Sequence, residues 1–262
     1  MRVRNDEAQL DVRIDGENGD AVVLLAGFPL TREIWDAQAQ TLAATHRVIR
    51  PDLRGMGASS APPGPYLMET LAGDIAAVLD AIGVERAALV GHSLGGYVAI
   101  AFARMYCERL THLALVCSRI GADTPETMEL RYDLADRAEA EASIAPIAQW
   151  YEPRLRASGD EHDAVKSALI HATVNAIDPR GAAAMLRGMA VRDAGDDIAG
   201  DLDLPVLVVA GGRDQLLPEA AARQTAAAFS RGEFLVCERS GHLPMLDEPV
   251  EIEQALARLL AR

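Results

Sequence analysis

Residues 88–96 read Ala-Leu-Val-Gly-His-Ser-Leu-Gly-Gly, and residues 97–102 continue as Tyr-Val-Ala-Ile-Ala-Phe. The first residues form an apolar run typical of a buried strand, and the last form a helical run. Ser93 would then occupy a sharp strand-to-helix turn, whose strained backbone leaves no space for side chains two positions to either side. Gly91 and Gly95 occupy those two positions. The stretch therefore predicts a nucleophilic serine at position 93.

The glycines around Ser93 allow two other interpretations. The five-residue pattern alone also fits a glycine-rich turn, and only the strand before it and the helix after it make it specific. A nucleotide site is not indicated, because no G-x-G-x-x-G follows a predicted strand and no lysine follows the glycines, as a phosphate-binding loop requires.

A serine hydroxyl needs a base to remove its proton, and the chain has six histidines. His242 lies in the loop 238–244 after the last predicted strand, at the sheet edge where Ser93 is expected. His92 adjoins the serine, but its side chain should point to the opposite side of the turn. The remaining histidines are interpreted as structural: His46, His112, His162 and His171. His242 is therefore the candidate base.

Asp214 is the candidate carboxylate that orients this histidine. It follows the predicted strand Val206–Ala210 directly, although a turn aspartate that caps a helix near Pro218 would look the same. The 28 residues between Asp214 and His242 fit one helix and one strand, which return the chain to the same edge. The order Ser, Asp, His is the one expected after a nucleophile elbow. Asp247 is the nearest rival, but no strand positions it.

Outward from these residues, short apolar runs alternate with segments of helical period. Such alternation indicates an α/β fold with a mostly parallel sheet and helices on both faces. Ala8–Ile14 has the period of an exposed strand and predicts an antiparallel lead-in to the sheet. The other predicted strands are Ala21–Ala26, Arg47–Leu53, Ala87–Val90, Leu113–Cys117, Val206–Ala210 and Phe234–Cys237.

One interval of about 85 residues, between the strands near Ser118 and Val206, has helical pattern but no convincing strand. It is too long for a simple crossover. We interpret it as an inserted helical cap over the carboxyl edge of the sheet, where open α/β sheets bind ligands. The predicted division is an α/β core of residues 1–118 and 204–262 and a cap of residues 119–203.

Composition excludes several classes of protein. Among 262 residues, 25 Lys plus Arg oppose 39 Asp plus Glu, so the formal net charge is −14 and nucleic acid is not an expected partner. Residues 1–16 are polar and no apolar run is long enough to span a bilayer, so we expect a cytoplasmic protein without a membrane segment. Three scattered cysteines suit neither a disulfide scaffold nor a zinc site, and all are expected to be buried thiols: Cys107, Cys117 and Cys237.

Taken together, the motifs resemble those of the α/β-hydrolases, over nearly the whole chain outside the cap. Within that superfamily the chain is most similar to small microbial carboxylesterases and 3-oxoadipate enol-lactonases. The motifs that carry the resemblance are Gly27–Leu30, Pro51–Ser59, the elbow, Asp214 in its loop and Gly241-His242. One departure is Ala26 before Gly27, where relatives usually carry a histidine.

The resemblance implies a serine hydrolase that acts on a small ester or lactone through an acyl-enzyme. Ser93, His242 and Asp214 would form the triad, the Phe28 and Leu94 backbone N–H groups would form the oxyanion hole, and no metal or organic cofactor is required. Ser93 excludes a dehalogenase, which needs a carboxylate nucleophile. Enol-lactone hydrolysis, perhydrolysis and carbon–carbon bond hydrolysis use the same triad, and a non-catalytic small-molecule receptor is the alternative from another class.

The charge of the cap predicts the kind of ester. Residues 119–203 contain 17 Asp plus Glu and 9 Arg plus Lys, a net charge of −8. A ligand that enters beneath such a cap meets a negative field, so neutral short- to medium-chain esters should be preferred to anionic ones. Arg119 at the cap entry could locally reverse this preference.

Overall fold

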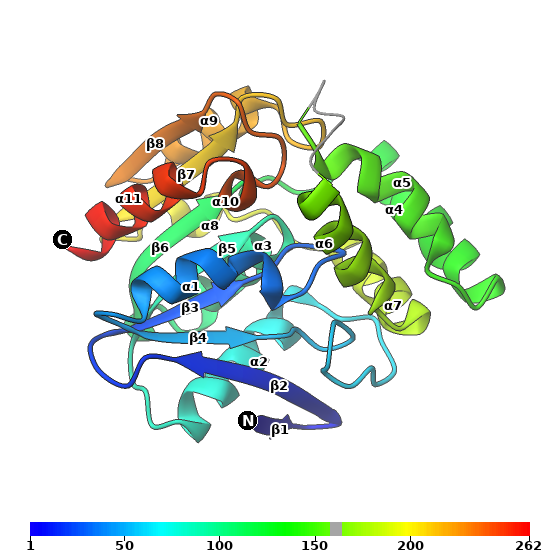
Figure 1. The fold of residues 1–262 in the computed structure, drawn as a ribbon, viewed down its shortest axis with the longest axis horizontal. Helices are drawn as coiled ribbons and strands as arrows, with labels where there is room; N and C mark the ends of the chain where they lie inside the picture. The colour runs from blue at the N-terminus through cyan, green and yellow to red at the C-terminus, as the bar shows by residue number, and fades with distance from the viewer. Residues whose placement is uncertain (158–163) are drawn as a thin grey trace.

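The computed structural model describes residues 1–157 and 164–262, which form an eight-stranded sheet in the order β1-β2-β4-β3-β5-β6-β7-β8 (Figure 1). Pairing is parallel from β4 through β3 to β8 and antiparallel at β1 and β2. The strands are β1 (Arg2–Asn5), β2 (Ala8–Asp15), β3 (Ala21–Leu25), β4 (Arg47–Pro51), β5 (Ala87–His92), β6 (Leu110–Val116), β7 (Val206–Gly211) and β8 (Gly232–Cys237). The predicted mostly parallel sheet with an antiparallel lead-in is confirmed.

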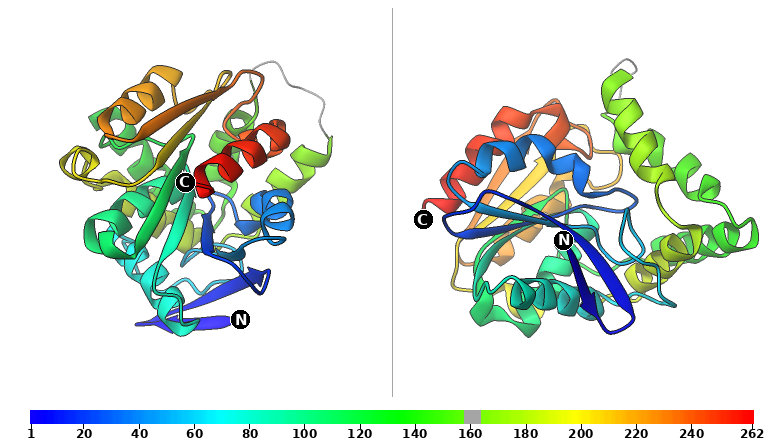
Figure 2. Two further views of the ribbon diagram at one scale, coloured as in Figure 1. Left: turned by 90° about the vertical axis from the view of Figure 1, so that its left-hand side faces the viewer. Right: turned by 60° about the horizontal axis from the view of Figure 1, so that its bottom comes forward.

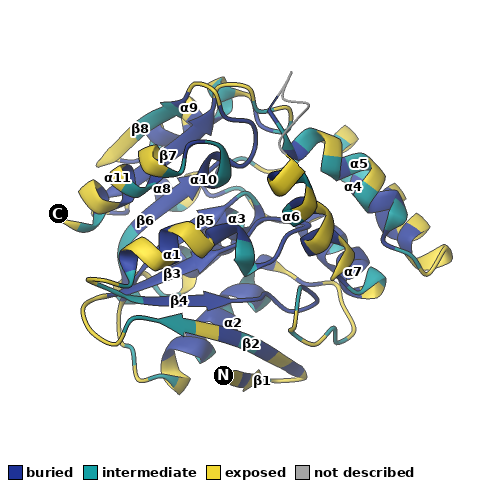
Figure 3. Ribbon diagram, viewed as in Figure 1, coloured by how far each residue is buried: buried dark blue, intermediate teal, exposed yellow. Residues whose placement is uncertain are grey.

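Burial follows the position of each strand in the sheet (Figure 3). Every residue of β3, β5 and β7 is buried, which explains why these strands are continuous apolar runs. The two edge strands carry exposed residues. Edge strand β1 was not predicted, because its four residues are too few to show a period.

Helices cover both faces of the sheet. On one face α1 (Asp36–Leu42) packs against α11 (Pro249–Leu260), and Figure 1 shows both in front of the strands. On the other face α2 (Met68–Ala81) packs against α3 (Leu94–Met105). The remaining helical segments of the core are η1 (Arg32–Trp35), η2 (Cys107–Arg109), α9 (Glu219–Ala228) and α10 (Pro244–Asp247).

Between β6 and β7 the described residues form helices and no strand. These helices are α4 (Pro125–Ala140), α5 (Ala145–Leu155), α6 (Ala164–Asn175), α7 (Pro179–Ala190) and α8 (Asp196–Ala199). Helix α4 packs against α5 and α7, and α5 packs against α6. Figure 2 shows α4 to α7 projecting from one side of the core, whereas Asp197 of α8 pairs with Arg104 of α3 at 2.6 Å. All five helices fall inside the interval predicted as a cap, whose division from the core stays a prediction.

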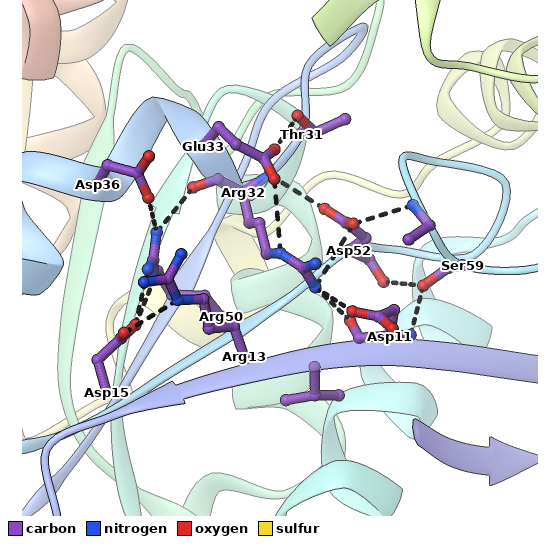
Figure 4. Close-up of polar contacts among 12 residues, drawn as sticks. Asp11, Arg13, Asp15, Thr31, Arg32, Glu33, Asp36, Arg50, Asp52 and Ser59 are labelled. Carbon is purple, nitrogen blue, oxygen red and sulfur yellow. Dashed lines mark hydrogen bonds and ion pairs between the residues drawn. The ribbon is translucent and has the colours of Figure 1, made fainter. Parts of the chain in front are cut away.

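A polar network holds the loop after β3 against β4 (Figure 4). Asp52 accepts hydrogen bonds from the backbone N–H groups of Arg32, at 3.1 Å, and Ala58, at 3.0 Å, while Arg32 pairs with Asp11 at 2.6 Å. A Cβ on Gly57, which has φ +49°, would lie 2.4 Å from the Asp52 carboxylate. The segment after β4 thus serves here as a support for the loop that carries Phe28.

The cysteine prediction was wrong at one position. Cys117 and Cys237 are buried, but Cys107 is exposed, because it starts the short helix η2 beyond the end of α3 and its side chain leaves the core. In the described part of the chain, no helix has the length and apolarity needed to cross a membrane.

Candidate active site

Ser93 lies between β5 and α3 on a strained turn. Its backbone has φ 49° and ψ −113°, in a region that residues with a Cβ rarely adopt. A Cβ on Gly91 would lie 2.3 Å from the Gly95 carbonyl oxygen, and a Cβ on Gly95 would lie 2.6 Å from the Leu25 carbonyl oxygen. Both positions therefore exclude side chains, as the sequence pattern predicted.

His242 and Asp214 lie on the loops after β8 and β7, at the same edge of the sheet as Ser93. His242 Nδ1 donates a hydrogen bond to Asp214 Oδ2 over 2.7 Å, and both side chains are at most 3% exposed. The other carboxylate oxygen accepts the backbone N–H groups of Leu216, at 2.7 Å, and Leu217, at 3.1 Å. Burial alone would raise the pKa of Asp214, but His242 and these two N–H groups outweigh it and lower the pKa. Asp214 stays ionised and holds the proton on Nδ1.

The opposite ring nitrogen is left as a base. His242 Nε2 is buried and makes no hydrogen bond to any residue that the structure describes. His242 and Ser93 line the same cavity, although no hydrogen bond joins Nε2 to Ser93 Oγ in the described residues. Catalytic hydrogen bonds are often long before substrate binds.

Two backbone N–H groups beside Ser93 are available to an oxyanion. Leu94 is the first residue of α3, where the helix provides no acceptor for its N–H, and Phe28 lies in the loop after β3. Within residues 1–157 and 164–262 neither N–H donates a hydrogen bond. A hydrogen bond of 2.9 Å from Leu30 N–H to Gly27 O closes the turn that carries Phe28.

His92 joins the loops on either side of the serine. The Gly27 N–H donates to His92 Nδ1 over 3.1 Å, so the ring proton is on Nε2, which donates to the His242 carbonyl oxygen over 2.8 Å. Burial, and the nearby His242 ring, lower the pKa of His92 to about 3. The ring therefore stays neutral and keeps this tautomer. Sequence reasoning placed His92 away from the serine but missed this connection.

Cys117, Asp214 and His242 offer ligand-type atoms within 4.8 Å of one another. A metal ion there would have to displace the His242–Asp214 hydrogen bond. Burial and the neighbouring Asp214 also raise the pKa of the Cys117 thiol well above its usual range, so the thiol keeps its proton. These residues fit an acid–base pair better than a metal centre.

The cavity above Ser93 has a volume of about 240 Å³. Its floor comes from α3 and the loops after β3, β5, β6, β7 and β8, and its roof comes from α4, α5 and α7. The lining combines aromatic and aliphatic side chains with three arginines, and among the described residues no carboxylate lines it. The arginines are Arg119, Arg131 and Arg154.

Several residues considered from sequence lie outside this cavity. Asp247, the rival carboxylate, accepts the Gly241 N–H over 2.8 Å and pairs with Lys166 at 2.5 Å. It therefore stabilises the loop that carries His242. The cavity is not lined by His46, His112 or His171. His162 falls outside the described residues.

Comparison with known proteins agrees with this architecture. Residues 20–249 match the family model for the alpha/beta hydrolase fold. An esterase from Thermogutta terrifontis, solved with malate bound, is 34% identical, with a TM-score of 0.94 over 100% of this chain and 97% of that chain. The enol-lactonase from Burkholderia xenovorans LB400 is 27% identical, with a TM-score of 0.92 over 100% of both chains. RutD, a proposed carbamate hydrolase of Variovorax paradoxus strain S110, is 30% identical over 94% of this chain and 93% of its own.

The family match spans most of the chain, so the protein belongs to the α/β hydrolase fold family. Together with the esterase and enol-lactonase neighbours, it identifies the chain as a hydrolase.

Proposed function

We propose that the protein hydrolyses carboxylic esters through a covalent acyl-enzyme formed on Ser93. The observation that carries the proposal is the buried His242, which is bonded to Asp214 through Nδ1 and has its Nε2 unpaired among the described residues, in the cavity that Ser93 lines. A hydroxyl on a strained turn beside such a base is the arrangement that activates a serine.

In the first step Nε2 takes the proton of Ser93 Oγ as the oxygen attacks the ester carbonyl. The carbonyl oxygen becomes negative and accepts hydrogen bonds from the N–H groups of Phe28 and Leu94. Asp214 stabilises the imidazolium, which then protonates the departing alcohol. In the second step water gives a proton to Nε2, its oxygen attacks the acyl-enzyme, and the carboxylic acid leaves as Ser93 regains its proton.

The size of the cavity favours small substrates. Its volume of about 240 Å³ lies below the roughly 300 to 1,000 Å³ typical of pockets for drug-sized ligands. The proposal is therefore an esterase for short acyl chains. Lactone, carbamate and carbon–carbon substrates would use the same residues, and a substrate panel that includes a lactone separates these activities.

Replacement of the nucleophile tests the proposal. Ser93→Ala should reduce steady-state kcat for p-nitrophenyl butyrate by about 10⁴-fold or more, because the acyl-enzyme cannot form. Ser230→Ala, at an exposed serine after α9, is the matched control and should turn over as the wild type does. Turnover of Ser93→Ala above a few per cent of wild type would overturn the assignment. A single stoichiometric burst from the wild type, with no steady rate, would favour the receptor.

A further inference from the structure

An arginine cluster borders the cavity over Ser93. Asp123, whose side chain is fully buried, pairs with Arg119 at 3.0 Å, with Arg192 at 2.5 Å and with Arg131 at 2.5 Å. Burial alone would raise the pKa of Asp123, but Arg131 and Arg192 outweigh it and lower the pKa, so the carboxylate is ionised at neutral pH. Three guanidinium groups against one carboxylate leave the cluster with a formal charge of +2.

The three arginines of the cluster differ in how their N–H donors are paired within the described part of the chain. Arg192 donates to the Gly121 carbonyl at 2.7 Å and stacks 3.8 Å from the Tyr97 ring, and Arg131 donates to the Tyr151 hydroxyl at 3.2 Å. Arg119, by contrast, has a buried Nε with no hydrogen-bond partner in the described part of the chain. Its guanidinium has five N–H donors, and Asp123 occupies only one side of it.

A second arginine on the wall of the cavity has no acidic partner within residues 1–157 and 164–262. Arg154, on α5, lies 4.4 Å over the Trp150 ring and donates one hydrogen bond of 2.6 Å to the Trp150 carbonyl. Among the described residues it forms no ion pair, and no carboxylate lines the cavity. The acidic groups of the cap that the structure describes thus lie outside the cavity, while the described lining presents positive charge to its contents.

We propose that Arg119 and Arg154 form an anion subsite that binds a carboxylate on the acyl part of the substrate. The inference rests on the proposed ester hydrolysis and names its substrate class: half-esters of short dicarboxylic acids. A carboxylate matches the planar donor set of a guanidinium, and charge-assisted hydrogen bonds of this kind are stronger than those between neutral groups. The proposal differs from the expectation of a neutral ester, which came from the net charge of the cap, and takes up the local reversal that Arg119 could cause.

The first test compares two methyl esters of the same length, monomethyl glutarate and methyl 5-methylhexanoate, which carries an isopropyl group where the other has its carboxylate. By pH-stat titration, wild-type kcat/KM should be about tenfold or more higher for monomethyl glutarate, as expected from one to two charge-assisted hydrogen bonds. Arg119→Met and Arg154→Met should each lower this ratio about tenfold. Arg137→Met, at an exposed arginine on α4, is the matched control and should keep the wild-type ratio.

A binding measurement separates failure of the subsite from failure of the proposed reaction. Calorimetric titration of the wild type should show glutarate binding about tenfold or more tightly than the neutral glutaramide, and both arginine variants should lose the difference. Arg119→Lys keeps the charge but lacks Nε and the planar fork, and it should restore only part of the preference. Equal affinity for the two ligands, or ratios that do not change in either methionine variant, would overturn the subsite. If glutarate binds as expected but no ester is hydrolysed, the subsite stands and the proposed reaction fails.

Discussion

His92 shows how one residue can fix the spacing of a whole site. Its two ring nitrogens connect the Gly27 N–H, beside the proposed oxyanion donor Phe28, to the carbonyl of His242. Sequences that this chain resembles usually carry a histidine at the position of Ala26. In this chain a different histidine, His92, contacts the next residue, Gly27. Because the ring is buried and neutral, these two hydrogen bonds do not change over the working pH range.

Asp214→Asn should lower kcat by about 10³- to 10⁴-fold without unfolding the protein. An asparagine amide donates to Nδ1, which moves the ring proton to Nε2 and removes the base that faces Ser93. Steady-state kinetics on p-nitrophenyl butyrate measure the loss, and circular dichroism confirms the fold.

Asp247→Asn is the comparison, because Asp247 is the rival carboxylate that the sequence offered. It pairs with Lys166 and accepts the Gly241 N–H, so its replacement removes an ion pair between two side chains that are at most 7% exposed. We expect a lower free energy of unfolding, by about 1.5 to 3 kcal/mol, as for the loss of one charge-assisted hydrogen bond, with a kcat much closer to wild type. If Asp247→Asn were the variant that lost activity, Asp214 would not be the triad carboxylate.

The sequence predicted the three triad candidates because each follows a strand whose end lies at one edge of the sheet. That rule needs only the order of strands and loops. The same rule could not predict which arginines line the cavity. Arg131 and Arg154 come from α4 and α5, and which face of these helices turns toward Ser93 depends on how the cap helices pack.

Within the strand-turn-helix unit β5–α3, close backbone contacts leave no space for side chains at two positions. Gly91 and Gly95 approach each other so closely that any side chain on Gly91 would collide with backbone atoms, which cannot move as a flexible side chain can.

Central strands were predicted well because burial on both faces makes them apolar throughout. Strand β6 starts at Leu110, three residues before its predicted start, because the half-buried polar residues Thr111 and His112 interrupt the apolar pattern.

Gly91→Ala should therefore destabilise the protein and reduce activity together. The added Cβ would lie 2.3 Å from the Gly95 carbonyl oxygen, so the turn must shift, and overpacking of this kind costs about 1 to 3 kcal/mol. Urea unfolding gives the change in free energy, and kcat reports the displacement of Ser93. Gly200→Ala is the control, since its Cβ would meet nothing within 4 Å and its φ is −71°. We expect that variant to be as stable as wild type or slightly more stable.

For the whole molecule, net charge and local charge have opposite signs. The chain carries −14 in total, yet the cavity is bordered by three arginines and, among the described residues, by no carboxylate. Total charge governs long-range encounter and is screened by salt over about 10 Å at 0.1 M, whereas contacts inside a cavity are screened much less. The expectation of a neutral ester came from the net charge of the cap, with Arg119 named as the residue that could reverse it, and the fold shows that Arg131 and Arg154 line the cavity as well.

Acid should destabilise the molecule in a pH range set by His92. Its pKa falls from 6.5, the value expected in the unfolded chain, to about 3 in the fold. Between these values the unfolded state binds a proton that the folded state does not. The free energy of unfolding therefore falls as the pH drops below 6.5, by about 1.4 kcal/mol per pH unit, or about 2 kcal/mol by pH 5. Carboxylates with a lowered pKa, such as Asp214 and Asp123, change the free energy of unfolding mostly at lower pH.

Urea unfolding of wild type and two variants at pH 7 and pH 5 tests this assignment. His92→Asn keeps one acceptor for Gly27 and one donor for His242 but cannot titrate, so its loss of stability between the two pH values should be about 2 kcal/mol smaller than that of wild type. His112→Asn removes a histidine whose pKa is also lowered by burial but which is only half-buried, so this variant should keep most of the wild-type loss. A loss in His92→Asn equal to that of wild type would show that the acid sensitivity arises elsewhere. The comparison holds even if both variants are less stable than wild type at pH 7, because each protein serves as its own reference between the two pH values.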